Sequence, residues 1–157
     1  MEGGRAPVEE RNQGGWALVV ERTQGGCALV VERTRFLREK LVSLLGRAGW
    51  QVEGTAREGG AALELARRYR PDLVVLDLVL PDMPGTELIR AIKAELPGCR
   101  VVVCSALVQS RWVKAAVEAG ADDFVIKPVD EARFLAAVEG DLARPPAPQR
   151  QALDEGA

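Results

Sequence analysis

The sequence predicts an α/β fold in which five β-α units build one doubly wound parallel sheet. Two observations support this prediction. Five short apolar segments rich in valine and leucine alternate with five segments whose apolar residues recur at helical spacing. The strand segments are apolar along almost their whole length, which is typical of parallel strands that helices cover on both faces. The length of 157 residues and the apolar content of 47% suit a single domain with one core.

The predicted strands are short runs of apolar and β-branched residues. In chain order they are Cys27–Glu32, Trp50–Thr55, Asp72–Asp77, Arg100–Ser105 and Asp122–Ile126. The predicted helices place apolar residues on one stripe, and glycine or proline stands at the breaks between elements. In chain order they are Thr34–Arg47, Glu58–Tyr69, Pro84–Glu95, Gln109–Gly120 and Asp130–Leu142. The crossovers between parallel strands are expected to be right-handed.

The N-terminal end carries an internal repeat. Three tandem units, at 3–13, 14–24 and 25–35, share the pattern Gly-Gly-x-Ala-x-Val-x-Glu-Arg. We assign the third unit to the first strand because it runs directly into the first helix. If the second unit took that place, Glu21 and Arg22 would replace Glu32 and Arg33.

The repeat divides the chain into three parts. Residues 1–26 form an N-terminal arm, 27–142 the folded domain, and 143–157 a tail rich in proline and glutamine that we expect to be flexible. The arm is either partly disordered or holds an extra strand in its apolar second unit. Such a strand would add to a sheet edge of the same subunit or of another one, which leaves a homodimer open.

The composition excludes several classes of function. The chain has no histidine, so it has no serine-histidine or cysteine-histidine nucleophile and no imidazole metal site. Cys27, Cys99 and Cys104 lack metal-ligand spacing and are interpreted as reduced core residues of a cytoplasmic protein. The interspersed charges, with a net charge of −2, argue against a nucleic-acid surface. No apolar run approaches the ~20 residues that a membrane span needs.

Polar residues stand where the apolar strands end. They are Glu32 and Arg33, Asp77, Ser105 and Lys127. Because ligands of such sheets bind beyond the carboxyl ends of the strands, we expect these side chains to converge on one site. A carboxylate can act as a nucleophile, and a lysine and a hydroxyl can hold phosphoryl oxygens. The pattern therefore favours chemistry on an anionic group.

Three stretches carry a resemblance to a known family. They are DLVVLDLVLPDMPGTEL at 72–88, VVVCSA at 101–106 and AGADDFVIKPVD at 119–130. All three resemble receiver domains of response regulators, and the likeness covers about residues 27–142. The resemblance implies the flavodoxin-like strand order 2-1-3-4-5. It also implies two-component signalling, with a phosphoryl group arriving from a histidine kinase or phosphotransfer protein and a downstream protein partner. A doubly wound enzyme is disfavoured, since the chain lacks a glycine-rich phosphate loop.

The resemblance also implies roles for individual residues. Asp77 looks like the phosphoacceptor, and Ser105 and Lys127 look like the residues that bind the phosphate. Phe124 is similar to the aromatic switch residue, although a core position alone would also explain it. The backbone carbonyl of Val79 would join Glu32 and Asp77 in binding Mg²⁺, and the Lys127–Pro128 peptide bond would be cis.

The sequence departs from the family at one position. Receivers usually place two adjacent acids after the first strand, whereas this chain has Glu32 followed by Arg33. Counting Glu32, Arg33, Asp77 and Lys127, the pocket would be formally neutral before any metal binds, so Mg²⁺ binding would be weakened or absent. In one alternative Arg33 turns outward and Asp77 is still phosphorylated, though slowly. In the other, the guanidinium pairs with Asp77 or Glu32 and the domain is a pseudo-receiver that signals by binding alone.

Overall fold

The computed structural model describes residues 26–140, which form a five-stranded parallel sheet in the order β2-β1-β3-β4-β5. The strands are β1 (Gly26–Val31), β2 (Trp50–Ala56), β3 (Leu73–Leu76), β4 (Arg100–Ser105) and β5 (Asp123–Ile126). The predicted fold class and strand order are confirmed. The repeat arm and the tail lie outside the described residues, except for the start of β1.

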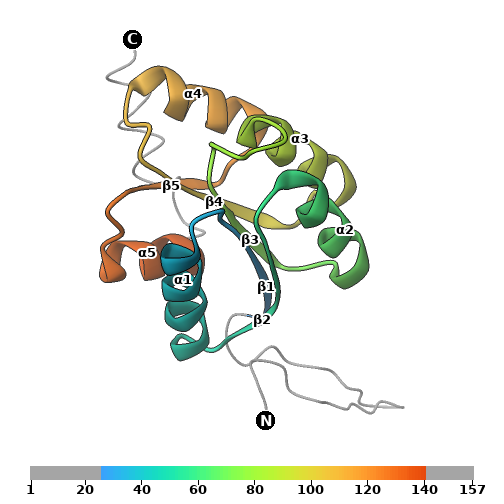
Figure 1. Cartoon of the computed structure of the whole chain (residues 1–157), viewed down its shortest axis with the longest axis vertical. Helices are drawn as coiled ribbons and strands as arrows, with labels where there is room; N and C mark the ends of the chain where they lie inside the picture. The colour runs from blue at the N-terminus through green and yellow to red at the C-terminus, as the bar shows by residue number, and fades with distance from the viewer. Residues whose placement is uncertain (1–25, 141–157) are drawn as a thin grey trace.

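Five helices of the described region join the strands (Figure 1). They are α1 (Arg35–Arg47), α2 (Gly59–Tyr69), α3 (Gly85–Glu95), α4 (Ser110–Ala119) and α5 (Glu131–Glu139). Each begins one residue later than predicted, because the predicted first residue serves as its N-cap. The prediction that the last helix reaches Leu142 is wrong: it ends at Glu139, since Gly140 adopts a φ of 76°, which is not helical.

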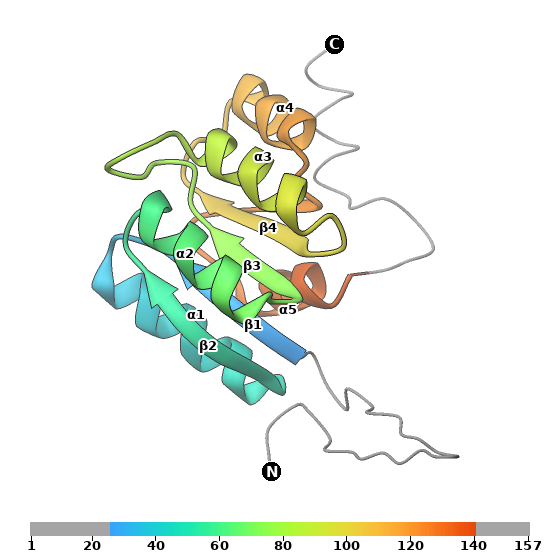
Figure 2. The ribbon, with the colours of Figure 1, turned by 90° about the vertical axis from the view of Figure 1, so that its right-hand side faces the viewer.

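The helices cover both faces of the sheet. Helices α1 and α5 lie on one face, and α2, α3 and α4 lie on the other (Figures 1 and 2). Two separate apolar clusters fill the layers, one on each face. Strands β1 and β3 contribute alternate residues to both clusters, and all of their residues are buried. This two-sided burial explains why the strands have no polar residues until the point where they end.

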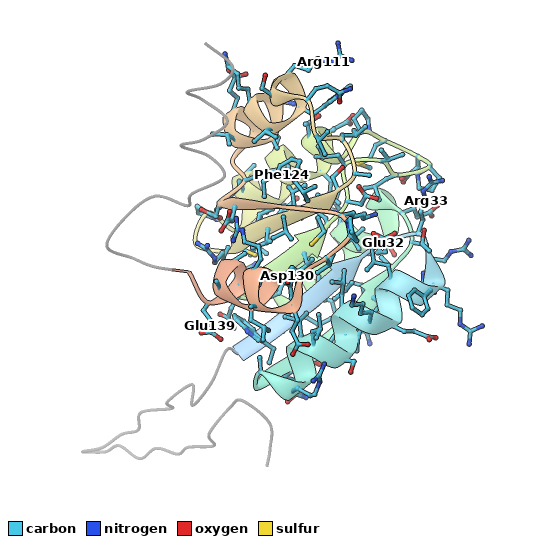
Figure 3. All side chains as sticks on the ribbon, turned by 90° about the vertical axis from the view of Figure 1, so that its left-hand side faces the viewer. Glu32, Arg33, Arg111, Phe124, Asp130 and Glu139 are labelled. Carbon is cyan, nitrogen blue, oxygen red and sulfur yellow. The ribbon has the colours of Figure 1, made fainter. Side chains whose placement is uncertain are left out.

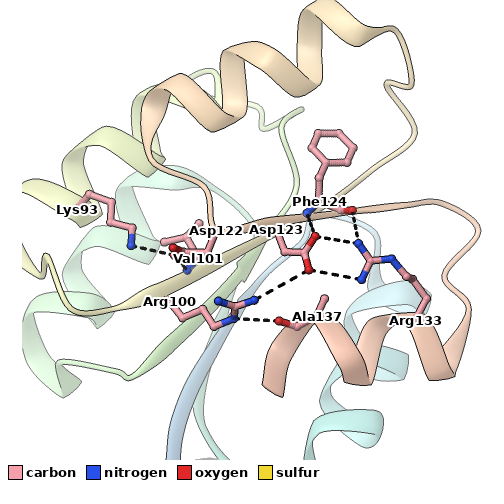
Figure 4. A network of polar contacts seen from close by, with 8 residues as sticks. All are labelled: Lys93, Arg100, Val101, Asp122, Asp123, Phe124, Arg133 and Ala137. Carbon is pink, nitrogen blue, oxygen red and sulfur yellow. Dashed lines mark hydrogen bonds and ion pairs between the residues drawn. The ribbon is translucent and has the colours of Figure 1, made fainter. Parts of the chain in front are cut away.

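Two aspartates at the start of β5 connect this strand to its surroundings (Figure 4). The buried Asp123 carboxylate accepts hydrogen bonds from the Arg133 guanidinium of α5 at 2.8 Å and from the backbone N–H of Phe124 at 2.8 Å. Asp122 accepts from Lys93 of α3 at 2.8 Å and from the N–H of Val101 at 2.8 Å. These contacts fix the position of β5 against helices on both faces.

Helix α3 approaches the end of β3 very closely at Gly85. Its N–H donates to the carbonyl of Leu78 at 2.8 Å. A Cβ at this position would lie 2.5 Å from the Leu78 Cα and 2.6 Å from the Asp77 carbonyl oxygen. Because both neighbours are backbone atoms, they cannot turn aside as a flexible side chain would.

We therefore expect Gly85→Ala to lower the free energy of unfolding by about 1–3 kcal/mol, the usual cost of overpacking. Gly98→Ala is the matched control, since a Cβ there meets no atom within 4 Å. Urea denaturation of both variants measures the difference. Equal stability of the two variants would show that the Gly85 contact does not constrain the loop.

Candidate functional site

The polar residues at the ends of β1, β3 and β5 are held by the sheet itself. Glu32, Asp77 and Lys127 lie just beyond their strands, yet each N–H still donates to a neighbouring strand: to Ala56, Val31 and Ser105, at 2.9, 3.2 and 2.9 Å. Their backbones are thus as firmly placed as the strands. The predicted convergence is present for Glu32, Asp77 and Lys127, whose side chains contact one another.

Lys127 lies between the two carboxylates. Its Nζ is 2.9 Å from Asp77 Oδ2 and 3.2 Å from Glu32 Oε1. Both acids are buried, with exposed fractions of 5% for Asp77 and 1% for Glu32. Burial acts to lower the pKa of Lys127, but the hydrogen bonds and charges of Asp77 and Glu32 outweigh it and hold that pKa above 10.5. The lysine therefore stays charged at neutral pH.

The remaining oxygen of each carboxylate is bound by backbone. Glu32 Oε2 accepts from the N–H of Thr34 at 3.1 Å, and Asp77 Oδ1 accepts from the N–H of Val79 at 3.3 Å. The buried Ser105 Oγ accepts from the N–H of Leu107 at 3.1 Å, which leaves the hydroxyl hydrogen free to donate elsewhere. The site thus offers one acidic nucleophile with a cation beside it and a hydroxyl on the adjacent strand.

Two further predicted features can be located. Phe124 is buried, with 2% of its surface exposed, and packs in the apolar cluster on the side of α2, α3 and α4 (Figure 3). A buried position agrees with the interpretation of Phe124 as a core residue. A switch role for its ring stays a prediction. The Lys127–Pro128 peptide bond is cis, as the resemblance implied.

Arg33 is exposed and lies outside the pocket (Figure 3). Within residues 26–140 its side chain makes no ion pair, and Lys127 is the cation that contacts Glu32 and Asp77. The outward alternative is the one seen here, so the charge at the site is −1 from Glu32, Asp77 and Lys127, and not the predicted neutral sum.

The donor set suits Mg²⁺ only in part. The two carboxylates and the Val79 carbonyl are oxygen donors, the kind that Mg²⁺ prefers. However, Lys127 already binds both carboxylates, and Arg33 supplies no oxygen in place of the usual second acid. Among the described residues, no group of three acidic, cysteine or histidine side chains is placed to hold a metal ion. The residues present therefore supply only part of the oxygen ligands that Mg²⁺ uses.

Two residues that shape the loops of the site, Arg38 and Asp82, were not predicted from the sequence. Arg38 donates through Nη1 to the carbonyl of Glu32 at 2.9 Å, which holds the loop after β1. Asp82 accepts from the N–H groups of Gly59 and Gly60, both at 2.8 Å, and so caps α2 from the loop after β3. Arg38 stands six residues after Glu32, a spacing that only weakly indicates a contact between them. The Asp82 contact joins residues too far apart in the sequence for any local pattern to predict it.

A lysine-paired aspartate at the carboxyl edge of a 2-1-3-4-5 sheet is the arrangement of a two-component signalling domain. Comparison with known families agrees, because the response regulator receiver domain model matches residues 28–139. The chain therefore belongs to the response regulator receiver domain family. No helix of the described region is long and apolar enough to cross a membrane.

Similar proteins support this assignment. The chemotaxis protein CheY of Thermotoga maritima is 36% identical over 103 residues, which cover 66% of this chain and 86% of that protein. A LuxR-family two-component response regulator from Aurantimonas sp. SI85-9A1 has a TM-score of 0.75 and 31% identity, covering 83% of this chain and 96% of that one. The CheX-CheY-BeF3-Mg+2 complex from Borrelia burgdorferi has a TM-score of 0.68 and 29% identity, covering 71% and 85%.

Replacement of Lys127 by methionine is expected to destabilise the fold. Without the ammonium, two buried carboxylates remain side by side with no cation between them, and we expect a loss of about 1–3 kcal/mol in the free energy of unfolding. The double variant Lys127→Met/Asp77→Asn removes one of the two charges and should recover part of the loss. Urea denaturation at pH 7 measures both; no recovery in the double variant would contradict the shared-lysine arrangement.

The same ion pairs predict an alkaline limit. Because the pKa of Lys127 is raised in the folded state, its stabilising contribution is complete below pH 10.5 and is lost as the pH rises through the higher folded-state value. Unfolding followed between pH 8 and about pH 12 should show a steeper loss for the native chain than for Lys127→Met. Parallel curves would show that the lysine is not the titrating group.

Proposed function

We propose that Asp77 accepts a phosphoryl group from a histidine kinase or phosphotransfer protein, and that the chain then signals through contacts with a downstream protein. The observation that carries this proposal is the 2.9 Å contact between the buried Asp77 carboxylate and Lys127. Ser105 at the end of the adjacent β4 supplies the hydroxyl that such a group needs. The domain would act in the cytoplasm as a signalling module and would not turn over a foreign substrate.

The proposed step is a direct transfer. An Asp77 oxygen attacks the phosphorus of a phosphohistidine, the P–N bond breaks, and an aspartyl phosphate forms while the leaving imidazole takes up a proton. Lys127 then pairs with a phosphoryl oxygen, and the Ser105 hydroxyl donates to another. The charged lysine offsets the charge that develops on these oxygens.

Mg²⁺ would be held by Glu32, Asp77 and the Val79 carbonyl. When bound, it neutralises charge on the phosphoryl group. The similar CheX-CheY complex from Borrelia burgdorferi contains BeF3 and Mg²⁺. In this chain Arg33 lowers the affinity, because a unit charge ~4 Å from another contributes ~4 kcal/mol at an effective dielectric of ~20, and an exposed arginine at a longer distance contributes less.

A second candidate function follows from Arg33 itself. With an arginine where receivers usually have an acid, the domain can serve as a pseudo-receiver, a binding module whose contacts do not depend on phosphorylation. The exposed position of Arg33 favours the phosphoacceptor function over this one, because the guanidinium leaves Asp77 and Lys127 facing each other.

Incubation of the full chain with a small acyl-phosphate donor and Mg²⁺, followed by intact-mass measurement, tests the phosphoacceptor function. We expect the mass of one phosphoryl group to be added to the native chain, more slowly than to a receiver with two acids, and none to be added to Asp77→Asn. Absence of the adduct in the native chain at saturating donor would favour the pseudo-receiver.

Arg33→Asp tests the origin of the weak metal site. The substitution removes a positive charge and adds an oxygen ligand, so we expect Mg²⁺ affinity, measured by calorimetry, to rise about tenfold or more. Arg90→Asp, an exposed arginine on α3, is the matched control and should leave the affinity within about twofold. Equal effects of the two changes would show that Arg33 acts only through net charge.

A further inference from the structure

A hollow lies next to the loop after β1. It has a volume of about 960 Å³ and is open to solvent. It lies between the loops that follow β1 and β2, the start of α2, and Pro81. Its lining residues are Arg33, Thr34, Arg38, Thr55, Ala56, Arg57, Glu58, Ala61 and Pro81. We call this hollow the arginine pocket.

The arginine pocket has an excess of positive charge. Its lining includes three arginines, Arg33, Arg38 and Arg57, and one acid, Glu58. The Asp82 carboxylate lies at the start of α2 beside it, so the three positive charges exceed the two negative ones. Within residues 26–140 no ion pair includes these three arginines, whereas five other arginines are paired with an acid: Arg35, Arg47, Arg67, Arg100 and Arg133. The pocket therefore gathers cationic groups that the described part of the chain leaves without acidic partners.

The backbone of the pocket is held in place by contacts of its own. Arg38 Nη1 donates to the carbonyls of Glu32 and Arg33, at 2.9 and 3.4 Å, and so fixes the loop that carries Arg33. On the opposite wall, the N–H groups of Gly59 and Gly60 are already bound by Asp82. The start of α2 is thus occupied, and a ligand would have to be bound by the guanidiniums.

The N-terminal end of α1 adds positive partial charge next to the arginine pocket. The first turn of α1 contains no acidic residue, and the side chain of its N-cap, Thr34, makes no capping hydrogen bond. Arg33 stands next to this helix end, which carries the positive partial charge of the helix dipole. No acidic side chain in the first turn of α1 offsets the positive charge of Arg33 and of the helix end. An anion bound there would therefore be stabilised by both.

We propose that the arginine pocket binds a small anion with several phosphate oxygens, of the pyrophosphate class. The planar guanidinium matches two such oxygens at once, and three of them suit an anion with more than one phosphate. The volume lies in the range of small-molecule sites. The apolar part of the lining is limited to Ala56, Ala61 and Pro81 with no aromatic ring, which favours an anion over an apolar ligand. The proposal does not depend on phosphorylation of Asp77.

Titration of the full chain with inorganic pyrophosphate tests this site. EDTA excludes metal ions, potassium chloride holds the ionic strength constant, and calorimetry is combined with amide NMR shifts. We expect saturable binding at one site, with shifts centred on residues 33–34 and 55–58. Arg33→Gln and Arg57→Gln should each weaken binding about tenfold or more, since each removes charge-assisted hydrogen bonds. Glu58→Gln should strengthen it, because it removes the opposing charge.

Arg90→Gln is the matched control, because it removes an exposed arginine of α3 that does not line the pocket. It should leave the affinity within about twofold. The proposal is overturned by an absence of saturable binding or by an equal loss in Arg90→Gln. Shifts centred on Asp77 and Lys127 would also overturn it, since they would place the anion at the phosphoacceptor site. Tighter binding of a hexaglutamate peptide would instead assign the surface to an acidic protein partner.

Discussion

The site depends on one ammonium group shared by two buried carboxylates. Glu32 and Asp77 lie at the ends of neighbouring strands, and neither is exposed enough for water to screen their mutual repulsion. Lys127, from the far edge of the sheet, makes this arrangement tolerable by contacting both. Since the strands fix all three backbones, the lysine is held between the two acids by the sheet itself.

Much of this arrangement was predictable from the sequence. The alternation of apolar strands and amphipathic helices predicted the layers. The polar residues that end the strands predicted that Glu32, Asp77 and Lys127 meet, although Arg33 was expected among them. Sequence pattern succeeds here because a parallel sheet brings the same end of each strand to one edge. Strand order was inferred only from the resemblance, because periodicity does not tell which strands are neighbours.

The position of the Arg33 side chain could not be predicted from the sequence pattern, because it depends on the direction in which the side chain points. Arg33 follows Glu32 directly, yet one side chain is buried in the site and the other is exposed. Successive residues of an extended chain point to opposite sides, but the chain turns toward α1 at this point, so the sequence alone left both directions open. Asp82 was missed for a different reason, because its contacts reach back to Gly59 and Gly60 across the loop.

The Asp82 contact has a mechanical consequence. Its two backbone hydrogen bonds hold the pKa of Asp82 below its usual value, so the carboxylate is ionised at neutral pH and loses this grip only as acid protonates it. The same loop begins at Asp77, so the loop and the first turn of α2 are tethered to each other. A displacement of this loop would therefore stretch or break two hydrogen bonds at the first turn of α2.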